Sequence, residues 1–169
     1  MFKKKIILIF ISFFILQGNS FSSEKIAYMD FNYIINNSII GKKVLNDLNN
    51  LNKKNIENLK NEQKKLQKEA EEINKIKNIA NSEDIKKKIE IHNQNIKKYE
   101  NLKKTLSDNL NKKRNEEMKK IVQLINPLLE NYMKNNLIDI ILSKEVVFFS
   151  KEKYDISQKI LELTNQTYK

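Results

Sequence analysis

The sequence has no cysteine and no tryptophan, and its 169 residues include only one proline, one histidine and two glycines. Without cysteine, disulfides, thiol nucleophiles, iron–sulfur clusters and cysteine–zinc sites are excluded. A single histidine and the lack of a glycine-rich phosphate loop leave no recognisable catalytic or metal-binding motif. We therefore expect a protein that is not an enzyme and that needs no cofactor or metal. The scarcity of helix-breaking residues favours long helices.

Charged residues make up 31% of the chain, and their formal sum is +11. Residues 42–120 carry 22 Lys and Arg against 13 Asp and Glu, whereas residues 121–169 carry six of each. The positive charge is therefore concentrated in the middle of the chain. Such a region attracts acidic partners and anionic membrane surfaces, and salt weakens this attraction.

The N-terminus has the pattern of a secretory signal peptide. Three lysines at residues 3–5 precede an uncharged apolar run over residues 6–16 and then a polar stretch with small residues at Ser20 and Ser22. The apolar run is shorter than the roughly 20 residues that a membrane-spanning helix needs. We expect residues 1–22 to be a signal peptide that is cleaved after Ser22, so that the mature chain is exported. An uncleaved membrane anchor is the alternative.

The stretch NIANSEDIKKK, residues 78–88, interrupts the helical pattern of residues 42–120. Ser82 is a suitable N-cap for a new helix, and the two acidic residues that follow it lie where the helix dipole favours negative charge. We interpret the interruption as the tip, near residues 79–84, of a long antiparallel helical hairpin. Its first helix, up to residue 80, would be roughly 60 Å long at ~1.5 Å per residue.

Apolar residues in both halves of this hairpin recur at heptad spacing. The first half has one series interrupted by Asn52 and a partial second series: Leu45, Leu59, Leu66, Ile73 and Ala80, with Leu48, Ile56 and Ala70. The second half has one series with the only histidine and another interrupted by Lys103: Ile85, His92, Tyr99 and Leu106, with Ile89, Ile96 and Leu110. Two apolar positions per heptad predict a narrow two-stranded seam, and the polar interruptions predict a compliant coiled coil.

The two ends of the chain contain β-forming residues. KIAYMDF (25–31), LIDIIL (137–142) and VVFF (146–149) predict three strands. Because the apolar residues in these runs barely alternate, we expect the strands to be covered on both faces.

Helical signals surround these strands. NYIINNSII predicts a short helix before Gly41, and the stretch after Asp155 predicts a closing helix with Asp155 as N-cap and Gln158 completing a capping box. Pro127 should kink or restart the return helix.

The strands and the closing helix define a discontinuous body, residues 23–41 and 121–169, from which the hairpin of residues 42–120 projects. A body of roughly 68 residues buries too little apolar surface to be stable alone. Self-association that completes a shared β-core is the simplest remedy.

The order of these elements resembles the Skp (OmpH) family of periplasmic chaperones of Gram-negative bacteria. The likeness covers essentially the whole mature chain and depends on order and spacing rather than on one invariant motif. The matching segments are KIAYMDFNYIINNS, GKKVLNDL, the basic hairpin, LLENYMKNNLIDIIL, VVFF and YDISQKILELTNQ. The resemblance implies a mainly α fold with a small β-core, in which helical arms of a jellyfish-shaped homotrimer surround a cavity.

The resemblance also implies an ATP-independent holdase in the periplasm. Such a protein binds unfolded outer-membrane proteins in the cavity between its arms and prevents their aggregation during transit. The alternative is a structural coiled-coil scaffold of the envelope that binds folded partners, although a simple spacer would not need terminal strands. The signal peptide and the sparse aromatic residues of the arms argue against a nucleic-acid partner.

Two sets of candidate residues follow. Lysines beside the tip should contact client proteins or an anionic lipid or lipopolysaccharide surface, with a solvated helix face as the alternative: Lys75, Lys77, Lys86, Lys87 and Lys88. Apolar residues of the strands should form the β-core or the oligomer interface: Ile26, Tyr28, Ile138, Ile140, Val147, Phe148 and Phe149. For His92 and Tyr99 we expect seam packing rather than a metal, pH-switch or client-binding role.

Overall fold

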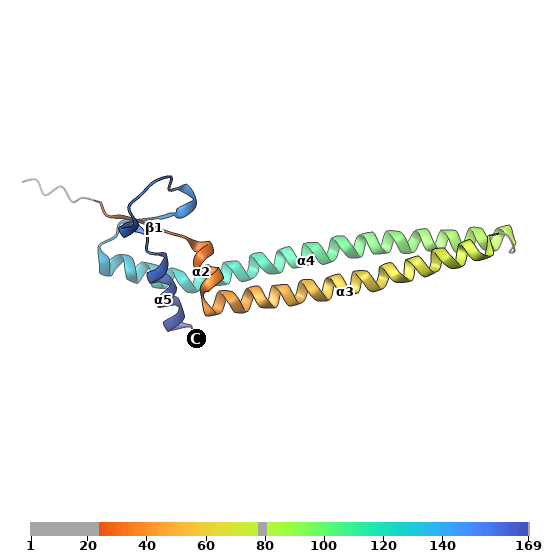
Figure 1. Ribbon diagram of the computed structural model, residues 1–169, viewed down its shortest axis with the longest axis horizontal. Helices are drawn as coiled ribbons and strands as arrows, with labels where there is room; N and C mark the ends of the chain where they lie inside the picture. Colours follow the sequence, from red (N-terminus) through yellow and green to blue (C-terminus); the bar gives the residue numbers. More distant parts are fainter. Residues whose placement is uncertain (1–23, 78–80, 169) are drawn as a thin grey trace, which may run out of the picture.

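The computed structural model describes residues 24–77 and 81–168, so the predicted signal peptide lies outside the described residues. The chain forms a small body and one long arm (Figure 1). The elements in chain order are β1 (Ile26–Met29), α2 (Phe31–Asn37), α3 (Ile39–Ile76), α4 (Ser82–Asn136), β2 (Ile140–Ser143), the short 3-10 helices η1 (Lys144–Val146) and η2 (Glu152–Tyr154), and α5 (Ser157–Thr167).

The arm is a pair of long helices that run side by side in opposite directions (Figure 1). Helix α3 has 38 residues, which corresponds to roughly 57 Å, and α4 has 55 residues and continues into the body. Helix α3 ends at Ile76 and α4 begins at Ser82, and the tip predicted near residues 79–84 falls partly on residues 78–80, which lie outside the described residues. The N-cap of α4 is Asn81 rather than Ser82, because the Asn81 side chain accepts the bond from the Glu83 amide at 3.3 Å.

Burial along the arm follows heptad spacing, but the predicted phase is wrong at several positions. The interruptions assigned to Asn52 and Lys103 do not exist, because both residues are exposed while the preceding Leu51 and Leu102 lie half-buried in the seam. Three residues assigned to the seam are exposed rather than half-buried, Ile56 most of all: Leu45 (36%), Ile56 (56%) and Ile89 (42%). A phase error of one residue rotates a side chain by about 100° around the helix.

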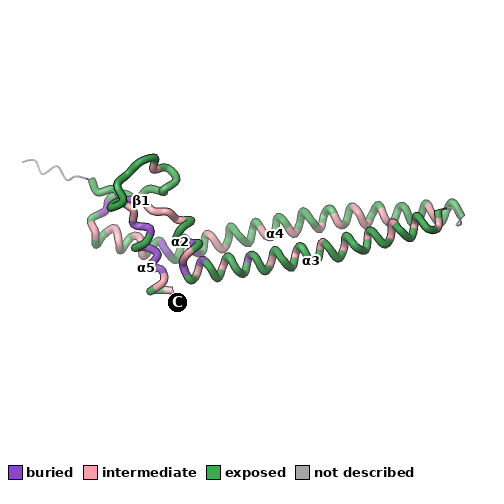
Figure 2. Tube along the Cα trace, viewed as in Figure 1, coloured by how far each residue is buried: buried purple, intermediate pink, exposed green. Residues whose placement is uncertain are grey.

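The body has one hydrophobic core, to which both ends of the chain contribute (Figure 2). Its nine buried members come from β1, α2, α4, the segment before β2, and α5 with the residue before it: Ala27, Ile34, Ile35, Ile121, Ile125, Ile138, Ile156, Ile160 and Leu161. Helix α5 packs against both α2 and α4. The base of the arm is therefore anchored in the core through α4.

The sheet has two strands rather than the predicted three. Strands β1 and β2 pair in parallel, with Ile26 opposite Ile140, and the arm supplies the long crossover connection that parallel pairing requires. The predicted strand at 146–149 is wrong: its first residue, Val146, belongs to η1, and the Val147 amide donates to the Lys144 carbonyl at 3.2 Å. This local turn uses backbone groups that a strand would offer to a neighbour. The expectation of strands covered on both faces is also wrong for the single chain, since most of β2 is exposed.

The connection between α2 and α3 is short and closely packed. The Ser38 side chain is fully buried and accepts a hydrogen bond from the Gly41 amide at 3.1 Å, while the Ser38 amide donates to the Ile34 carbonyl at 2.8 Å. A Cβ atom at Gly41 would lie 1.9 Å from the Ile35 carbonyl oxygen. Only glycine therefore allows the two helices to meet at this angle.

Helix α4 continues through Pro127, so the expected restart does not occur. The proline removes one helical hydrogen bond, and its neighbours hold the helix in place: Ile125 is fully buried, and the Tyr168 hydroxyl donates to the Leu124 carbonyl at 2.9 Å. The helix ends at Leu137, which adopts a left-handed conformation with φ of 54°. No helix in residues 24–77 or 81–168 is long and apolar enough to cross a membrane.

Candidate functional site

The described residues include no group of three or more His, Asp or Glu side chains that could hold a metal ion. The candidate functional parts are therefore surfaces: the tip of the arm, the apolar edge of the body and a polar interruption in the seam of the arm.

The tip of the arm brings together the five lysines that the sequence singles out. Lys75 and Lys77 lie at the C-terminal end of α3, and Lys86, Lys87 and Lys88 lie in the first two turns of α4. All five are exposed, and Lys87 forms an ion pair with Glu83 at 3.5 Å. The hairpin thus places both groups at the end of the arm farthest from the body (Figure 1). Their contact with a partner remains a prediction.

The seven apolar residues predicted for the core or interface differ in burial. Only Ile138 belongs to the buried core. Ile26, Ile140, Phe148 and Phe149 are exposed. The two phenylalanines are completely or almost completely exposed, with relative accessibilities of 104% and 92%. A core role for this phenylalanine pair is therefore wrong within one chain, whereas the interface role stays a prediction.

Two of these exposed residues, Ile26 and Phe149, line a hollow beside the sheet. The hollow has a volume of about 350 Å³, and its apolar lining comes from β1, β2 and the segment after η1: Ile26, Tyr28, Leu142, Val147, Phe149 and Tyr154. Tyr28 and Val147 are half-buried there. Because this hollow is lined mainly by apolar side chains and is open to solvent, it is a candidate interaction surface.

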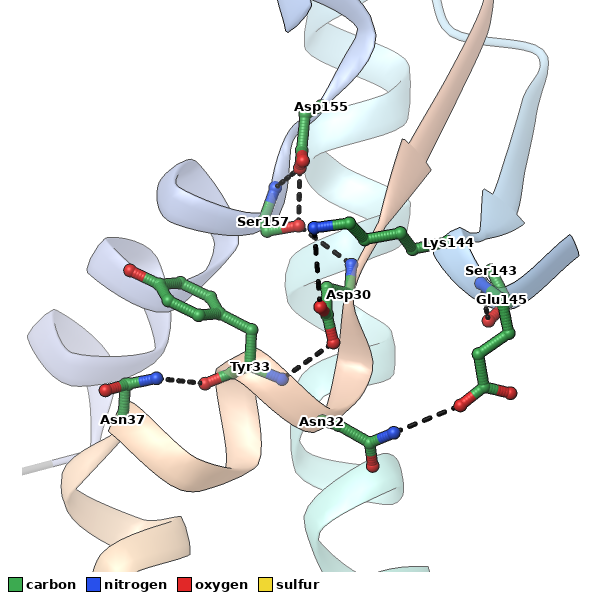
Figure 3. Close-up of polar contacts among 9 residues, drawn as sticks. All are labelled: Asp30, Asn32, Tyr33, Asn37, Ser143, Lys144, Glu145, Asp155 and Ser157. Atoms are coloured by element: carbon green, nitrogen blue, oxygen red, sulfur yellow. Dashed lines mark hydrogen bonds and ion pairs between the residues drawn. The ribbon is translucent and has the colours of Figure 1, made fainter. Parts of the chain in front are cut away.

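A polar network fastens the N-terminal segment of the body to the C-terminal one (Figure 3). The Ser157 hydroxyl accepts a hydrogen bond from the Asp30 amide at 2.8 Å and donates to the Asp155 carboxylate. Asp30 also pairs with Lys144 at 3.6 Å. Residues more than 110 positions apart in the sequence are thus held together around the end of β1.

The predicted capping box of the last helix does not form. Ile156 occupies the N-cap position, although Asp155 still accepts a hydrogen bond from the Ser157 amide at 2.9 Å. Gln158 instead accepts a hydrogen bond from the Tyr33 hydroxyl at 2.8 Å. The side chain that was expected to cap the helix therefore links α5 to α2.

The seam of the arm contains a polar cluster of Glu69, His92 and Asn95. Glu69 Oε2 lies 3.0 Å from His92 Nδ1, and Asn95 Nδ2 donates to Glu69 Oε1 at 3.0 Å. The His92 side chain is 17% exposed, which agrees with the predicted seam position. The hydrogen bond from His92 is the main cause that lowers the pKa of Glu69 below 4.5, with help from Asn95 and the charges of His92 and Lys98, whereas desolvation opposes the shift.

Sequence reasoning identified His92 in this cluster but missed its partner Glu69, and it missed Asn95, which donates to Glu69. Glu69 and Asn95 lie on different helices, and only the register between the helices brings them together. Their spacing from neighbouring seam residues was the available signal, because Glu69 lies three residues after Leu66 and Asn95 three after His92.

The comparisons with known proteins agree with this architecture. The family described as outer membrane protein (OmpH-like) matches residues 25–163, so the chain belongs to the Skp/OmpH family and the resemblance is confirmed. The fold is similar to the crystal structure of a proposed OmpH-like outer membrane chaperone from Caulobacter crescentus CB15, with a TM-score of 0.77, 13% identity, and coverage of 89% of this chain and 90% of that chain. No curated protein shows a significant sequence match.

Proposed function

We propose that this protein is an ATP-independent holdase chaperone of the periplasm, which binds unfolded outer-membrane proteins and prevents their aggregation during transit. The observation that carries the proposal is the combination of a long basic arm with a small body whose sheet edge is apolar and exposed. Membership of the OmpH-like family supports the same role.

The physical basis is the chemistry of the client. Strands of outer-membrane barrels alternate apolar and polar residues, and they cannot bury the apolar ones before they insert into the membrane. Such chains aggregate unless their exposed segments are shielded. Arms that enclose a cavity can shield a chain through many weak contacts, and their positive charge attracts acidic segments at low salt.

We propose that the working unit is a homotrimer joined through the body. Within the described residues, β2 pairs only with β1, so its other edge offers free backbone groups. The exposed Ile140, Phe148 and Phe149 lie on β2 or just after it. Association of three copies through these residues would cover both the apolar side chains and the strand edge.

Native mass spectrometry of the mature chain, residues 23–169, tests the function directly. The protein is measured alone and mixed with an outer-membrane barrel protein that is diluted from urea. We expect a trimer that captures the unfolded barrel protein and ignores the same protein once it is folded. A stable oligomer without affinity for the unfolded chain would overturn the holdase proposal and favour the envelope scaffold.

Substitutions at the body edge test how the oligomer forms. The double variant Phe148→Ser and Phe149→Ser should shift the mature protein from trimer to monomer, because both side chains lose their apolar contacts with the neighbouring copies. The matched control is Ile56→Ser with Ile91→Ser, which alters two exposed isoleucines of the arm and should leave the trimer intact. A trimer that is equally stable in both variants would contradict the proposed interface.

Charge substitution at the tip tests the role of the lysines. Replacing Lys75, Lys77, Lys86, Lys87 and Lys88 with Gln should weaken binding to the unfolded client or to anionic vesicles. The control changes five exposed lysines nearer the body, so that the net charge changes by the same amount: Lys53, Lys54, Lys60, Lys64 and Lys68 to Gln. Equal losses in the two variants would mean that the overall charge of the arm, and not the tip, attracts the partner.

A further inference from the structure

The described part of the chain contains two asparagine–serine pairs, one on either side of α3. They are Asn37–Ser38, in the body, and Asn81–Ser82, where α4 begins. Asparagine is chemically labile, because the backbone nitrogen of the next residue can attack its side-chain amide. None of the asparagines in the sequence is followed by glycine, so serine is the smallest residue that follows any of them. These pairs therefore offer the least steric hindrance to this attack.

The Asn37–Ser38 pair is held in a way that prevents the attack. The Ser38 amide, which would be the nucleophile, donates to the Ile34 carbonyl at 2.8 Å, and Ser38 is fully buried. The Asn37 side-chain nitrogen donates to the Tyr33 carbonyl at 2.8 Å, as Figure 3 shows. Both reacting groups are thus engaged as long as the body is folded.

The Asn81–Ser82 pair lies in the opposite environment. Both residues are exposed, and the Ser82 amide finds no acceptor inside α4 because Ser82 is the first residue of that helix. The Asn81 side-chain oxygen accepts a hydrogen bond from the Glu83 amide at 3.3 Å. A donor at this oxygen stabilises the negative charge that develops there when the carbonyl carbon is attacked. The same dipeptide is therefore protected in the body and accessible at the start of α4.

We propose that Asn81 is a site of spontaneous deamidation in the folded protein. The Ser82 backbone nitrogen attacks Cγ of Asn81 and forms a cyclic imide. The bond between Cγ and Nδ2 breaks, and Nδ2 leaves as ammonia with the proton of the Ser82 amide. Water then opens the imide at either carbonyl and leaves an aspartyl or an isoaspartyl residue at position 81. The net reaction converts an amide and water into a carboxylic acid and ammonia, so it needs no oxidant, cofactor or enzyme.

Both products place a carboxylate close to the lysines of the first two turns of α4, Lys86, Lys87 and Lys88. In the aspartyl product the carboxylate stays at the N-cap, where the helix dipole stabilises it. In the isoaspartyl product the backbone gains a methylene group, and the cap geometry is lost. Conversion therefore lowers the positive charge of this end of the arm, whether or not the protein acts as a chaperone.

Peptide mapping by mass spectrometry tests the proposal on the folded mature protein, incubated in mildly alkaline buffer. Asn81 should convert at least roughly tenfold faster than Asn37, because buried and hydrogen-bonded groups react only when the body opens. In urea, where both pairs are unfolded, the two rates should be similar. Equal rates in the folded protein would overturn the proposal, as would an Asn81 that converts in urea but not in the folded protein.

Two substitutions of Ser82 test the route. Ser82→Pro removes the attacking N–H group, and proline is favoured at the first position of a helix. Asn81 already has φ of −59° and ψ of 137°, the extended conformation that a residue before proline requires. Conversion at Asn81 should therefore stop while the helical circular dichroism is unchanged. The matched control, Ser82→Gly, keeps the amide hydrogen, reduces the steric hindrance and should accelerate conversion. Conversion at the native rate in Ser82→Pro would overturn the attack by Ser82.

Discussion

The body and the arm of this chain are stabilised by different means. The body gathers nine buried apolar residues from both ends of the sequence and joins them by hydrogen bonds between distant segments, such as that from the Asp30 amide to Ser157. Along the arm most seam residues are only half-buried, and most ion pairs join residues three or four positions apart on one helix. The body therefore depends on long-range packing, and the arm on local helix formation with a thin apolar seam.

The largest expected effect comes from Gly41, where the body meets the arm. Gly41→Ala would place a Cβ atom 1.9 Å from the Ile35 carbonyl oxygen, and a backbone atom cannot move aside as a flexible side chain can. We expect the free energy of unfolding to fall by about 4 kcal/mol, which is diagnostic of a severe steric conflict. Chemical denaturation followed by circular dichroism measures this free energy of unfolding. Asn49→Ala, at an exposed position of α3, is the control, and an equally small change in both variants would show that the junction adapts.

The difference between body and arm predicts that truncating a core residue costs more stability than truncating a seam residue. Ile160 is fully buried in the core, so Ile160→Ala should lower the free energy of unfolding by about 3 kcal/mol through lost burial and a residual cavity. Leu59 is half-buried in the seam, where water and neighbouring side chains can fill the space, so Leu59→Ala should cost about 1 kcal/mol. Denaturation of both variants under one set of conditions gives the ratio of the two losses in the free energy of unfolding. Equal losses would mean that the seam is packed as tightly as the core.

The same contrast explains what could be predicted from the sequence. The hairpin was predictable because helix signals and the break before Ser82 are local. Its seam phase was wrong at Asn52 and Lys103, because heptad counting alone does not distinguish a position from its neighbour. The prediction of a strand at 146–149 was wrong because β-forming residues need a partner strand. Within one chain, the turn at Lys144 instead forms a hydrogen bond between the Val147 amide and the Lys144 carbonyl.

Contacts between distant residues could not be predicted in the same way. The link from Tyr33 to Gln158 and the pairing of Glu69 with Asn95 each require a register that arises only when the helices pack. Motifs within one segment therefore predicted the elements, and the packing between segments determined which side chains meet.

A smaller effect, of opposite sign, is expected where α4 ends. Leu137 adopts a left-handed conformation that costs an L-residue roughly 1 kcal/mol, and its side chain is 80% exposed, so it contributes little burial. Leu137→Gly should therefore raise the free energy of unfolding by about 0.5–1 kcal/mol. Thermal unfolding provides the measurement. Leu124→Gly, within the regular helix, should destabilise, and destabilisation by both changes would contradict the left-handed cap.

The smallest expected effect is the pH dependence of the arm. The hydrogen bond from His92, aided by Asn95, lowers the pKa of Glu69 below 4.5, so the folded state favours the ionised carboxylate. Its contribution to stability is fully present above pH 4.5 and is lost as the pH falls through the lowered pKa.

The charged groups around this carboxylate come from both helices. Glu62, Lys65 and Glu72 lie on α3, and Lys88 and Lys98 lie on α4. To isolate Glu69 from them, we compare the melting temperatures of the native protein and Glu69→Gln between pH 3 and pH 7. The advantage of the native protein should shrink as the solution is acidified below pH 4.5. Glu71→Gln removes the same charge at an exposed position outside the cluster, and a difference that shrinks equally for this control would show that general charge, and not the cluster, causes the pH dependence.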